Sequence, residues 1–326
     1  MAGSNSRERT SLIVTVLNEA GTIDALLASV AAQTRPPDEV VVVDGGSDDG
    51  TWPRLEAWTE RLPLRLIRAP RAGIARGRNL AIDAASGTVI AVTDAGVRLE
   101  PDWLERLQAA LTEDTDIVSG FFSPETTTIF ERAMGATVLP GLSDIDPATF
   151  LPSSRSILFR RAAWAAVGGY PEWLDYGEDL VFDLALKARN YQFAFAADAC
   201  VEFRPRGSFG AFFRQYYQYA RGDGKADLWR LRHAIRYATY AAAVMLLRRG
   251  GLGISLIALG ALAYTRRPYA RLQPRLGGLA LNDIAYALVL VPAIRLVGDM
   301  AKMLGYPVGV WWRLRHKGLW ISRSSS

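Results

Sequence analysis

The segment Val40–Thr51, VVVVDGGSDDGT, decides the fold expected for this chain of 326 residues. Four consecutive valines favour a strand that is buried on both faces of a sheet. The strand ends at Asp44, which places a carboxylate at its tip, and Gly45 and Gly46 then allow positive φ angles and close approach of a ligand. Ligands of open α/β sheets bind beyond the carboxyl ends of strands. We therefore predict a ligand contact here, with an ordinary acidic turn as the alternative.

Segments typical of strands and helices alternate on both sides of this stretch. Further strands are expected at Ser11–Leu17, Leu64–Arg68, Thr88–Thr93, Asp116–Gly120 and Ser153–Arg160. Helices are expected at Gly21–Thr34, Trp52–Leu62, Pro101–Leu111 and Leu180–Arg189. The alternation predicts an α/β fold with a mostly parallel sheet. Gly120–Phe150 has an irregular composition, which fits either an acceptor-side loop or a poorly packed connection.

Two carboxylates are expected at the same edge of this sheet. Asp44 and Asp94 each follow a buried strand, so in a parallel sheet both face one crevice. Between them lies Arg71–Asn79, RAGIARGRN, predicted as a loop that leads into a helix. Carboxylates bind ribose and base, and arginine binds diphosphate, so the crevice suits a nucleotide. The alternative is that these arginines are solvated surface charges.

Composition and missing motifs narrow the chemistry. The single cysteine, Cys200, excludes a disulfide framework, and two histidines make a histidine metal site or a Ser-His-Asp triad improbable. Acid–base chemistry is therefore expected from carboxylates. The sequence has neither G-x-G-x-x-G after its first strand nor a P-loop, which argues against dinucleotide-binding Rossmann and P-loop domains.

The chain resembles the inverting family 2 glycosyltransferases over roughly Ser11–Arg206. The matching segments are VTVLNEAGTIDALLASVAAQT, EVVVVDGGSDDGT, GIARGRNLAIDAASGTVIAVTDAG and VGGYPEWLDYGEDLVFDLALKA. Four motifs in the family's order make the resemblance specific for the family, though not for a substrate. It implies a GT-A (nucleotide-diphospho-sugar transferase) fold and a UDP- or GDP-sugar as donor.

The resemblance also implies roles for individual residues. Contacts to the nucleotide are expected from Leu17, Asn18, Glu19, Asp44, Gly46, Arg78, Asn79 and Asp94. Asp94 would begin the family's D-x-D motif, which meets the ribose and a divalent metal, Mn²⁺ or Mg²⁺. Here the motif continues as Ala95-Gly96, so the second aspartate is missing and metal affinity should fall.

Glu178 and Asp179 open the helix predicted at Leu180–Arg189. Acidic residues in a first helical turn are often there only because they favour the helix dipole. By resemblance, however, they occupy the family's E-D position, where the second carboxylate is the general base. We expect Asp179 to deprotonate the acceptor hydroxyl and Glu178 to orient the Asp179 carboxylate. Asp183 is expected to be structural.

A later segment, Gln218-Tyr-Ala-Arg221-Gly222, resembles the Q-x-x-R-W motif of processive relatives. Glycine replaces the tryptophan of that motif, which weakens any inference of processivity. Gln218 and Arg221 are candidates for contact with the diphosphate or an acceptor phosphate, with a surface role as the alternative.

The C-terminal third combines apolar segments with arginine. Tyr237–Leu247 and Gly251–Tyr264 are short for a membrane span, and Leu279–Val297 is marginal and interrupted by Pro292. The tail Val310–Trp320 mixes tryptophan with arginine and lysine, as interfacial anchors do. We predict helices associated with the cytoplasmic membrane and a catalytic domain on its cytoplasmic face. The alternative is a soluble helical subdomain.

The sequence therefore predicts a membrane-attached inverting glycosyltransferase with a lipid-linked or cell-envelope glycan acceptor, such as a polyprenyl phosphate. The domains expected are 10–206 for catalysis (nucleotide half 10–115, acceptor half 116–206), 207–232 as an amphipathic connection and 233–320 as membrane-associated helices. A non-catalytic membrane partner is the rival, motivated by the missing aspartate. Nucleic-acid binding is disfavoured because the arginines alternate with apolar runs.

Overall fold

The structure is a computed structural model that describes residues 8–316. The chain divides into two compact units. The first, Met1–Ser123 with Asp144–Arg204, is called the sheet unit here; the second, Pro124–Ser143 with Pro205–Ser326, is called the helical unit. The segment Pro124–Ser143, expected within the catalytic domain from its position in the sequence, thus groups with the C-terminal helices.

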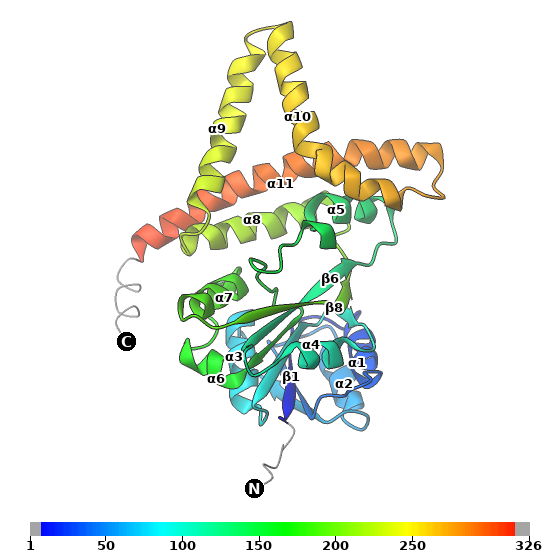
Figure 1. Ribbon diagram of the computed structural model, residues 1–326, viewed down its shortest axis with the longest axis vertical. Helices are drawn as coiled ribbons and strands as arrows, with labels where there is room; N and C mark the ends of the chain where they lie inside the picture. Colours follow the sequence, from blue (N-terminus) through cyan, green and yellow to red (C-terminus); the bar gives the residue numbers. More distant parts are fainter. Residues whose placement is uncertain (1–7, 317–326) are drawn as a thin grey trace. The chain divides into compact units, whose positions relative to one another are not determined.

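The sheet unit is built on one eight-stranded sheet with the order β3-β2-β1-β4-β7-β6-β8-β5 (Figure 1). Its strands are β1 Thr10–Val16, β2 Glu39–Asp44, β3 Leu64–Arg68, β4 Val89–Asp94, β5 Val97–Leu99, β6 Ile117–Pro124, β7 Ile157–Arg160 and β8 Phe193–Phe203. The pairs β1–β2, β1–β4 and β2–β3 are parallel, as the alternating pattern predicts. The valine strand lies next to β1 within this parallel half.

The second half of the sheet is antiparallel where its strands pair. β7 pairs antiparallel with both β4 and β6, so β4 and β6 run in the same direction with β7 inserted between them. β5 and β8, which the sequence patterns did not indicate, form another antiparallel pair. The connection from β6 to β7 does not place a helix on the sheet, because its helix belongs to the helical unit. Without such a crossover, antiparallel pairing is the simple outcome.

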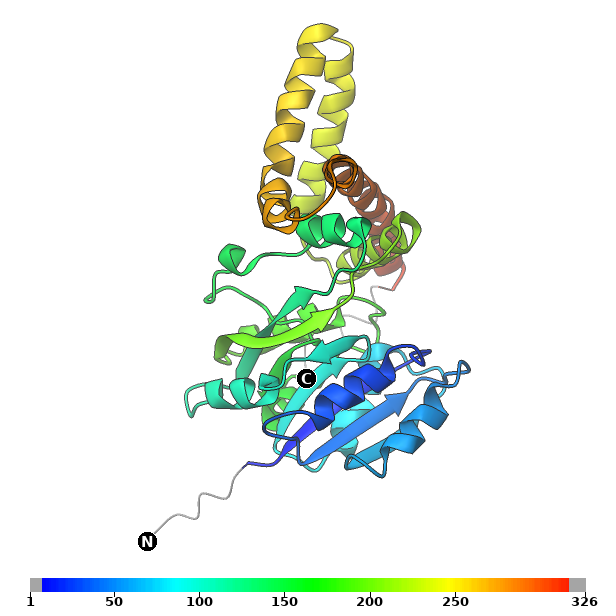
Figure 2. The ribbon, with the colours of Figure 1, turned by 90° about the vertical axis from the view of Figure 1, so that its right-hand side faces the viewer.

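Helices cover both faces of the sheet (Figure 2). One face is covered by α1 Ile23–Ala31, α2 Thr51–Trp58 and α4 Trp103–Ala110, and the other by α3 Ile74–Ala84, α6 Arg161–Ala166 and α7 Glu178–Ala188. The valines of β2 alternate between the faces: Val40 and Val42 pack on the first, and Val41 and Val43 on the second. A continuous valine run is therefore explained by burial on both sides.

Five longer helices make up the described part of the helical unit: α5 Ile129–Val138, α8 Phe209–Lys225, α9 Arg230–Leu247, α10 Gly251–Leu272 and α11 Leu281–Arg315. Helix α5 lies in the segment with irregular composition. It begins with a capping box in which Thr128 accepts from the Glu131 backbone N–H and Glu131 accepts from the Thr128 N–H. This cap gives the segment a defined helix start.

Helices α8 and α11 pack closely because glycines lie at their contact. A Cβ atom added to Gly305 or Gly309 would come within 2.2 or 2.1 Å of the backbone oxygen of Tyr217 or Arg221. Gly224 faces α11 in the same way, 2.3 Å from the oxygen of Tyr306. The four-residue spacing of Gly305 and Gly309 brings two helix backbones together at one face. No side chain other than hydrogen fits at these positions without moving a helix.

Among the described residues, α11 is the one helix long and apolar enough to cross a membrane by length and composition. The sequence predicted a marginal segment ending at Val297, but the helix continues to Arg315 through Pro292 and Pro307. The helix therefore includes the first residues of the predicted anchor Val310–Trp320, and residues 317–320 of that anchor lie outside the described part. Helices α9 and α10 expose many large apolar side chains, including Val244, Met245, Leu252 and Leu259. These side chains are not packed against other described residues.

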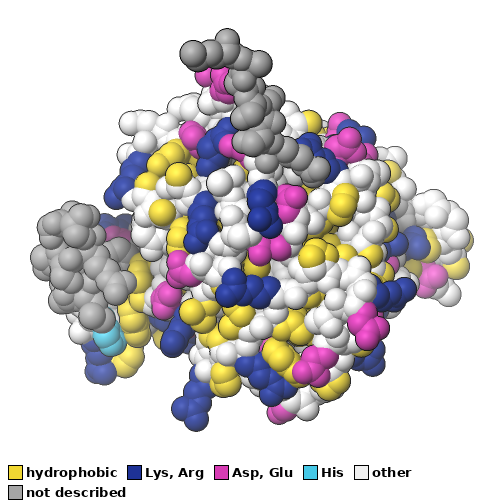
Figure 3. Space-filling view, turned by 90° about the horizontal axis from the view of Figure 1, so that it is seen from below, with side chains coloured by type: hydrophobic (Ala, Val, Ile, Leu, Met, Phe, Trp, Pro, Cys, Tyr) yellow, Lys and Arg dark blue, Asp and Glu magenta, His cyan; other side chains and the backbone are white. Residues whose placement is uncertain are grey.

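The face of the molecule in Figure 3 carries basic and acidic side chains interspersed with one another. The formal net charge of +5 is therefore not collected into a single basic patch on this face. Mixed surface charge of this kind favours solubility and does not by itself mark a binding surface.

Candidate active site

The tips of β1 and β2 form a hydrogen-bonded platform at the carboxyl edge of the sheet. Asp44 is 1% exposed, and its Oδ1 accepts from the backbone N–H groups of Gly46 and Ser47 at 3.1 and 2.9 Å and from the Ser47 hydroxyl at 2.7 Å. Its other oxygen, Oδ2, is buried and has no partner among the described residues. Asp44 thus holds its own loop with one oxygen and keeps the other available to accept a hydrogen bond.

The end of β1 is tied to this loop. The Asn18 N–H donates to the Ser47 hydroxyl at 2.9 Å, and its Oδ1 accepts from the Asp48 N–H at 3.0 Å. Asn18 has a φ of 58°, a left-handed conformation that asparagine tolerates better than most residues. The Glu19 N–H donates to the Thr51 hydroxyl at 2.8 Å. Two loops distant in sequence therefore form one rigid surface.

Leu17 and Gly46 shape that surface. The Leu17 side chain is 57% exposed just after β1. A flat ligand such as a nucleobase can pack against this apolar side chain. Gly46 has a φ of 106°, and a Cβ there would meet the Pro70 Cα at 3.3 Å. Glycine is thus required both by its backbone conformation and by the close approach of the neighbouring loop.

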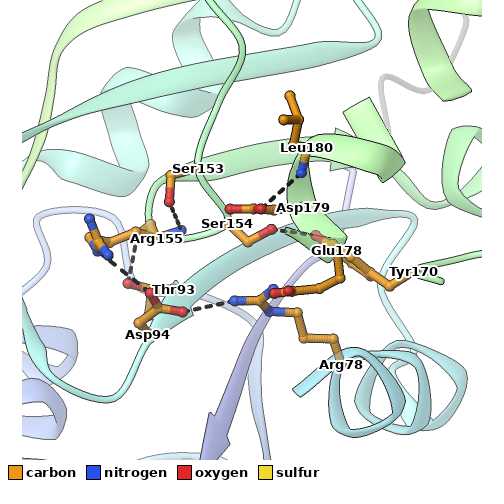
Figure 4. A network of polar contacts seen from close by, with 10 residues as sticks. All are labelled: Arg78, Thr93, Asp94, Ser153, Ser154, Arg155, Tyr170, Glu178, Asp179 and Leu180. Atoms are coloured by element: carbon orange, nitrogen blue, oxygen red, sulfur yellow. Dashed lines mark hydrogen bonds and ion pairs between the residues drawn. The ribbon is translucent and has the colours of Figure 1, made fainter. Parts of the chain in front are cut away.

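Arg78 connects the end of β4 to the start of α7 (Figure 4). Its Nη2 lies 2.9 Å from Asp94 Oδ1, and its Nη1 lies 2.7 Å from Glu178 Oε1. The guanidinium also lies over the Tyr170 ring, 5.3 Å from the ring centroid. Burial alone would lower the pKa of Arg78, but Glu178 and Asp94 outweigh it and raise the pKa above its usual value. Arg78 is therefore a fixed cation at the centre of the site. It lies within helix α3, which begins at Ile74, so the predicted loop 71–79 is helical over its second half.

Arg155 is the second cation at Asp94, and sequence analysis missed it. Its Nε lies 3.5 Å from Asp94 Oδ2, and its backbone oxygen accepts from the Thr93 hydroxyl at 2.9 Å. The guanidinium lies over the Phe203 ring at 4.1 Å. Arg155 comes just before β7, whose antiparallel pairing with β4 brings it to Asp94. The pattern around it indicated only a strand, so no sequence signal separated it from other arginines.

Glu178 and Asp179 are adjacent in sequence but differ in environment. Glu178 is buried, and burial raises its pKa to about 7, against the opposing effect of Arg78 and with a further rise from Asp179. Asp179 is only partly buried, and its Oδ1 accepts from the Leu180 N–H at 2.8 Å. The buried carboxyl is held by Arg78, while the neighbouring carboxyl keeps access to solvent. The roles of base for Asp179 and of orienting neighbour for Glu178 stay predictions.

Asp183 lies one turn further along α7 and is fully buried. Burial, followed by repulsion from Asp179, raises its pKa well above the usual value. Its Oδ2 has no partner among the described residues. Asp183 therefore lies inside the unit, and the structural role expected for it stays a prediction.

Asn79 anchors the segment between α6 and α7. Its amide nitrogen donates to the Tyr170 carbonyl at 2.9 Å and to Glu172 Oε1 at 3.1 Å, and its oxygen accepts from Tyr170 N–H and Trp164 Nε1. These four bonds use its full hydrogen-bonding capacity. A nucleotide contact from Asn79 stays a prediction, and it would require one of these bonds to be released.

Gln218 and Arg221 belong to α8 of the helical unit. Gln218 Oε1 is buried and has no partner among the described residues. The Arg221 backbone lies against Gly309 of α11. Their contact with a diphosphate or acceptor phosphate stays a prediction.

The described residues contain no group of three or more His, Cys, Asp or Glu side chains placed to hold a metal ion. Asp94 is the one carboxylate that remains of the D-x-D motif, and both of its oxygens face arginines. A divalent ion of the Mg²⁺ type needs only one or two protein carboxylates when substrate phosphates supply the other ligands. The residues present therefore fit an ion that arrives with the donor rather than a preformed metal centre.

Two family models match the chain: Glycosyl transferase family 2 over residues 11–162, and Glycosyl transferase family group 2 over residues 89–298. The chain belongs to the family 2 glycosyltransferases. Together the matches extend from β1 into α11, so they include the site and much of the helical unit. Family membership supports a transferase enzyme over the non-catalytic alternative.

Relatives with similar sequences include proteins named as glycosyltransferases or as polysaccharide biosynthesis proteins. Glycosyltransferase AglE of Haloferax volcanii is 28% identical over 246 residues, which are 73% of this chain and 79% of AglE. The succinoglycan biosynthesis protein ExoA of Rhizobium meliloti is 26% identical over 238 residues, 66% of this chain and 68% of ExoA. Both relatives are named for sugar transfer or polysaccharide synthesis, AglE as a glycosyltransferase and ExoA as a succinoglycan biosynthesis protein.

Solved structures with the same architecture are GT-A glycosyltransferases. The mannosyltransferase PcManGT from Pyrobaculum calidifontis, in complex with GDP-Man and Mn²⁺, has a TM-score of 0.55 at 21% identity and matches 97% of this chain and 88% of its own. Residues 1–349 of S. aureus TarS, in complex with UDP-GlcNAc, have a TM-score of 0.52 at 19% identity, with 90% of each chain covered. The predicted GT-A fold is confirmed.

Proposed function

We propose that this enzyme is an inverting glycosyltransferase that moves a sugar from a nucleotide-diphosphate donor to a hydroxyl or phosphate of a lipid-linked envelope glycan. The observation that carries the proposal is the bridge made by Arg78. It fixes Asp94, at the tip of β4, to Glu178, the neighbour of the solvent-accessible Asp179. A donor-side carboxylate and a candidate base are thereby held in one site.

Asp179 acts as the general base. Its carboxylate takes the proton of the acceptor hydroxyl while the hydroxyl oxygen bonds to the anomeric carbon. The bond from that carbon to the nucleoside diphosphate breaks in the same displacement, so the configuration at the carbon inverts. An acceptor that is a phosphate oxyanion has no proton to give, and Asp179 then only positions it. The ion pair with Arg78 holds the Glu178 side chain next to Asp179, the general base.

The nucleotide lies on the platform of the β1 and β2 tips. Leu17 covers one face of the base, and the unpartnered Asp44 Oδ2 accepts from a base N–H. Asn18 and Glu19 shape the base pocket through their backbone, and Gly46 permits the close approach. Such contacts suit a nucleoside diphosphate with either a pyrimidine or a purine base. The two structural neighbours are complexes with UDP-GlcNAc and GDP-Man.

The diphosphate end of the site needs added positive charge. Arg78 and Arg155 form ion pairs with Asp94 and Glu178, and Asp179 adds a third carboxyl group near Arg78, so the cations present are already matched. We infer that Asp94 is the protein ligand of a Mn²⁺ or Mg²⁺ ion that binds together with the donor phosphates. When bound, this ion neutralises charge on the leaving group.

The helical unit attaches the enzyme to the cytoplasmic face of the membrane. Helix α11 is long and apolar but carries Arg295, Asp299 and Lys302 near its middle, so it lies along the membrane surface, and α9 and α10 expose apolar side chains. Exposed arginines, Arg248 and Arg249 after the end of α9 and Arg266 and Arg267 within α10, favour the cytoplasmic side. An acceptor carried on a polyprenyl or similar lipid would be delivered at this surface.

A calorimetric titration of the detergent-held full chain tests the donor. UDP, GDP, UDP-GlcNAc and GDP-mannose are each titrated with and without Mn²⁺, and turnover is then measured with the donor that binds. We expect one nucleotide class to bind and Mn²⁺ to tighten the binding. If none of the four binds, the proposed function is wrong. Binding that is indifferent to Mn²⁺ would contradict only the role given to Asp94.

A further inference from the structure

The helical unit contains a pocket that the proposed reaction does not use. It lies between α5, α8, α10 and α11 and is open to solvent, with about 300 Å³ of empty space when the open part is counted. Three charged residues, Arg295, Asp299 and Lys302, line it together with the aromatic rings of Phe212, Tyr216 and Tyr264. All belong to one unit, so the pocket does not depend on how the units are placed.

The one carboxylate of the pocket wall is already satisfied. Asp299 is 3% exposed, and its Oδ1 accepts from Arg236 Nε at 2.8 Å. Its Oδ2 accepts from the hydroxyl groups of Tyr264 at 2.8 Å and Tyr240 at 3.1 Å. One salt bridge and two hydroxyl bonds from α9 and α10 thus converge on this single side chain of α11. Asp299 fixes the three helices and has little capacity left for a further cation.

The two other charged residues have no carboxylate partner in the part of the chain that the structure describes. The Lys302 ammonium lies over the Tyr216 ring at 4.9 Å, and the Arg295 guanidinium lies over the Tyr264 ring at 4.7 Å. Arg295 Nε is buried without an acceptor. Cation–π contacts offset only a small part of the cost of burying a charge.

The local charge is therefore positive. Arg236, Arg295 and Lys302 contribute three positive charges against the single negative charge of Asp299. The next acidic group, Asp223, pairs with His233 Nε2 at 3.1 Å, and His233 Nδ1 lies 3.2 Å from Arg236 Nη1. Counting Asp223 still leaves a surplus of positive charge. A half-open pocket with unpaired guanidinium and ammonium donors suits an anion with several acceptor oxygens.

We propose that this pocket binds the phosphate group of a membrane lipid. The source is a lipid because the helix that supplies Arg295 and Lys302 also exposes Leu296, Met300 and Leu304 beside them. An acyl or isoprenoid chain can lie along this apolar surface while its phosphate meets Lys302 and Arg295. The binding site is independent of glycosyl transfer, and it would exist in an inactive enzyme.

Calorimetric titration of the detergent-held full chain with dioctanoyl phosphatidic acid tests the proposal. Wild type should bind it, and Lys302→Met and Arg295→Gln should each weaken binding about tenfold, the loss of one charge-assisted contact. Lys302→Arg should keep most of the affinity. The matched control is Arg214→Gln, which removes the same charge from an exposed position on α8. It should bind like the wild type.

Dioctanoyl phosphatidylcholine and inorganic phosphate distinguish the sources. Phosphatidylcholine should bind more weakly than phosphatidic acid, because its choline cation meets the same positive pocket. Inorganic phosphate should bind more weakly because it lacks the chain. Equal binding of inorganic phosphate would overturn the lipid assignment. Equal loss in Arg214→Gln and Lys302→Met, or no loss in Lys302→Met with an unchanged melting temperature, would overturn the pocket itself.

Discussion

Two groups of buried charged residues differ in the sign of their net charge. The Arg78 network of the sheet unit (Arg78, Arg155, Asp94, Glu178 and Asp179) has more carboxyl groups than cations, whereas the Lys302 pocket of the helical unit (Arg295, Asp299 and Lys302, with Arg236) has more cations than carboxyl groups. Around Arg78 and Arg155, each arginine forms an ion pair with Asp94 or Glu178, and Asp179 nearby makes three carboxyl groups for two arginines. Around Lys302, cations outnumber carboxylates, and Arg295 and Lys302 lie over aromatic rings without an ion pair to a carboxylate among the described residues. The first arrangement needs a cation before it can hold a diphosphate, whereas the second needs an anion. The sign of the unbalanced charge therefore indicates what each site lacks.

The two regions also differ in access. Glu178 and Arg78 are buried, while Asp179 beside them is partly exposed, so the first network separates positioning groups from a reactive one. In the pocket, the buried and saturated group is Asp299, and the cations around it keep donors unused. A buried group whose hydrogen-bonding capacity is fully used fixes the geometry of its neighbours. An accessible group with unused donors or acceptors can bind a ligand. Four substitutions in the first region test this distinction.

Replacing Asp179 by asparagine should have the largest effect. The amide cannot take the proton of an acceptor hydroxyl, so transfer should fall about a thousandfold while nucleotide affinity changes little. Turnover and calorimetric nucleotide binding are measured on the same preparation. The control Asp83→Asn, at an exposed position on α3, should leave both unchanged. Transfer at the wild-type rate in Asp179→Asn would show that the base lies elsewhere.

Arg78→Met should destabilise the sheet unit by about 3 kcal/mol, because it leaves buried Glu178 without its partner. Denaturant unfolding monitored by circular dichroism gives the difference. Arg76→Met is the matched control, since it removes the same charge from an exposed position on the same helix. If both variants lose equal stability, the bridge from Asp94 to Glu178 does not hold the site together.

The raised pKa of Glu178 predicts a pH dependence of stability. Burial raises this pKa from 4.5 to about 7, so between these values the folded protein holds a proton that the unfolded chain releases. Stability should therefore fall as pH rises from about 4.5 to 7, with Glu178 contributing about 2 kcal/mol of the fall. Glu178→Gln cannot titrate, and its stability should decline less over this range. Glu60→Gln, at an exposed position, should follow the wild type.

Gly96→Asp should have the smallest effect, and it tests the charge deficit directly. A Cβ at Gly96 has no neighbour within 4 Å, so the second aspartate of the family motif can be restored without a clash. Mn²⁺ in the presence of nucleotide should bind about tenfold more tightly, because a second carboxylate joins Asp94. Gly96→Ala is the steric control. Equal Mn²⁺ affinity in the two variants would argue against an ion at Asp94.

Much of the sheet unit could be predicted from the sequence. The valine run and the acidic glycine loop indicated β2 and the ligand edge, and the alternation of segments indicated the parallel half. These features are local, because burial on both faces and turn chemistry are written in neighbouring residues. Glu178 and Asp179 were found only through the family's motif, since acidic residues open many helices.

Contacts between distant segments were decided by the tertiary structure. Arg155 reaches Asp94 only because β7 inserts antiparallel beside β4, and no local pattern marks it. Arg295, Asp299 and Lys302 lie in one helix whose spacing indicates merely a shared face. Their function depends on Arg236, Tyr240 and Tyr264 arriving from other helices to saturate the carboxylate. Sequence thus determined which groups carry charge, and packing determined which charges remain without partners, because pairing depends on distance and burial rather than on order along the chain.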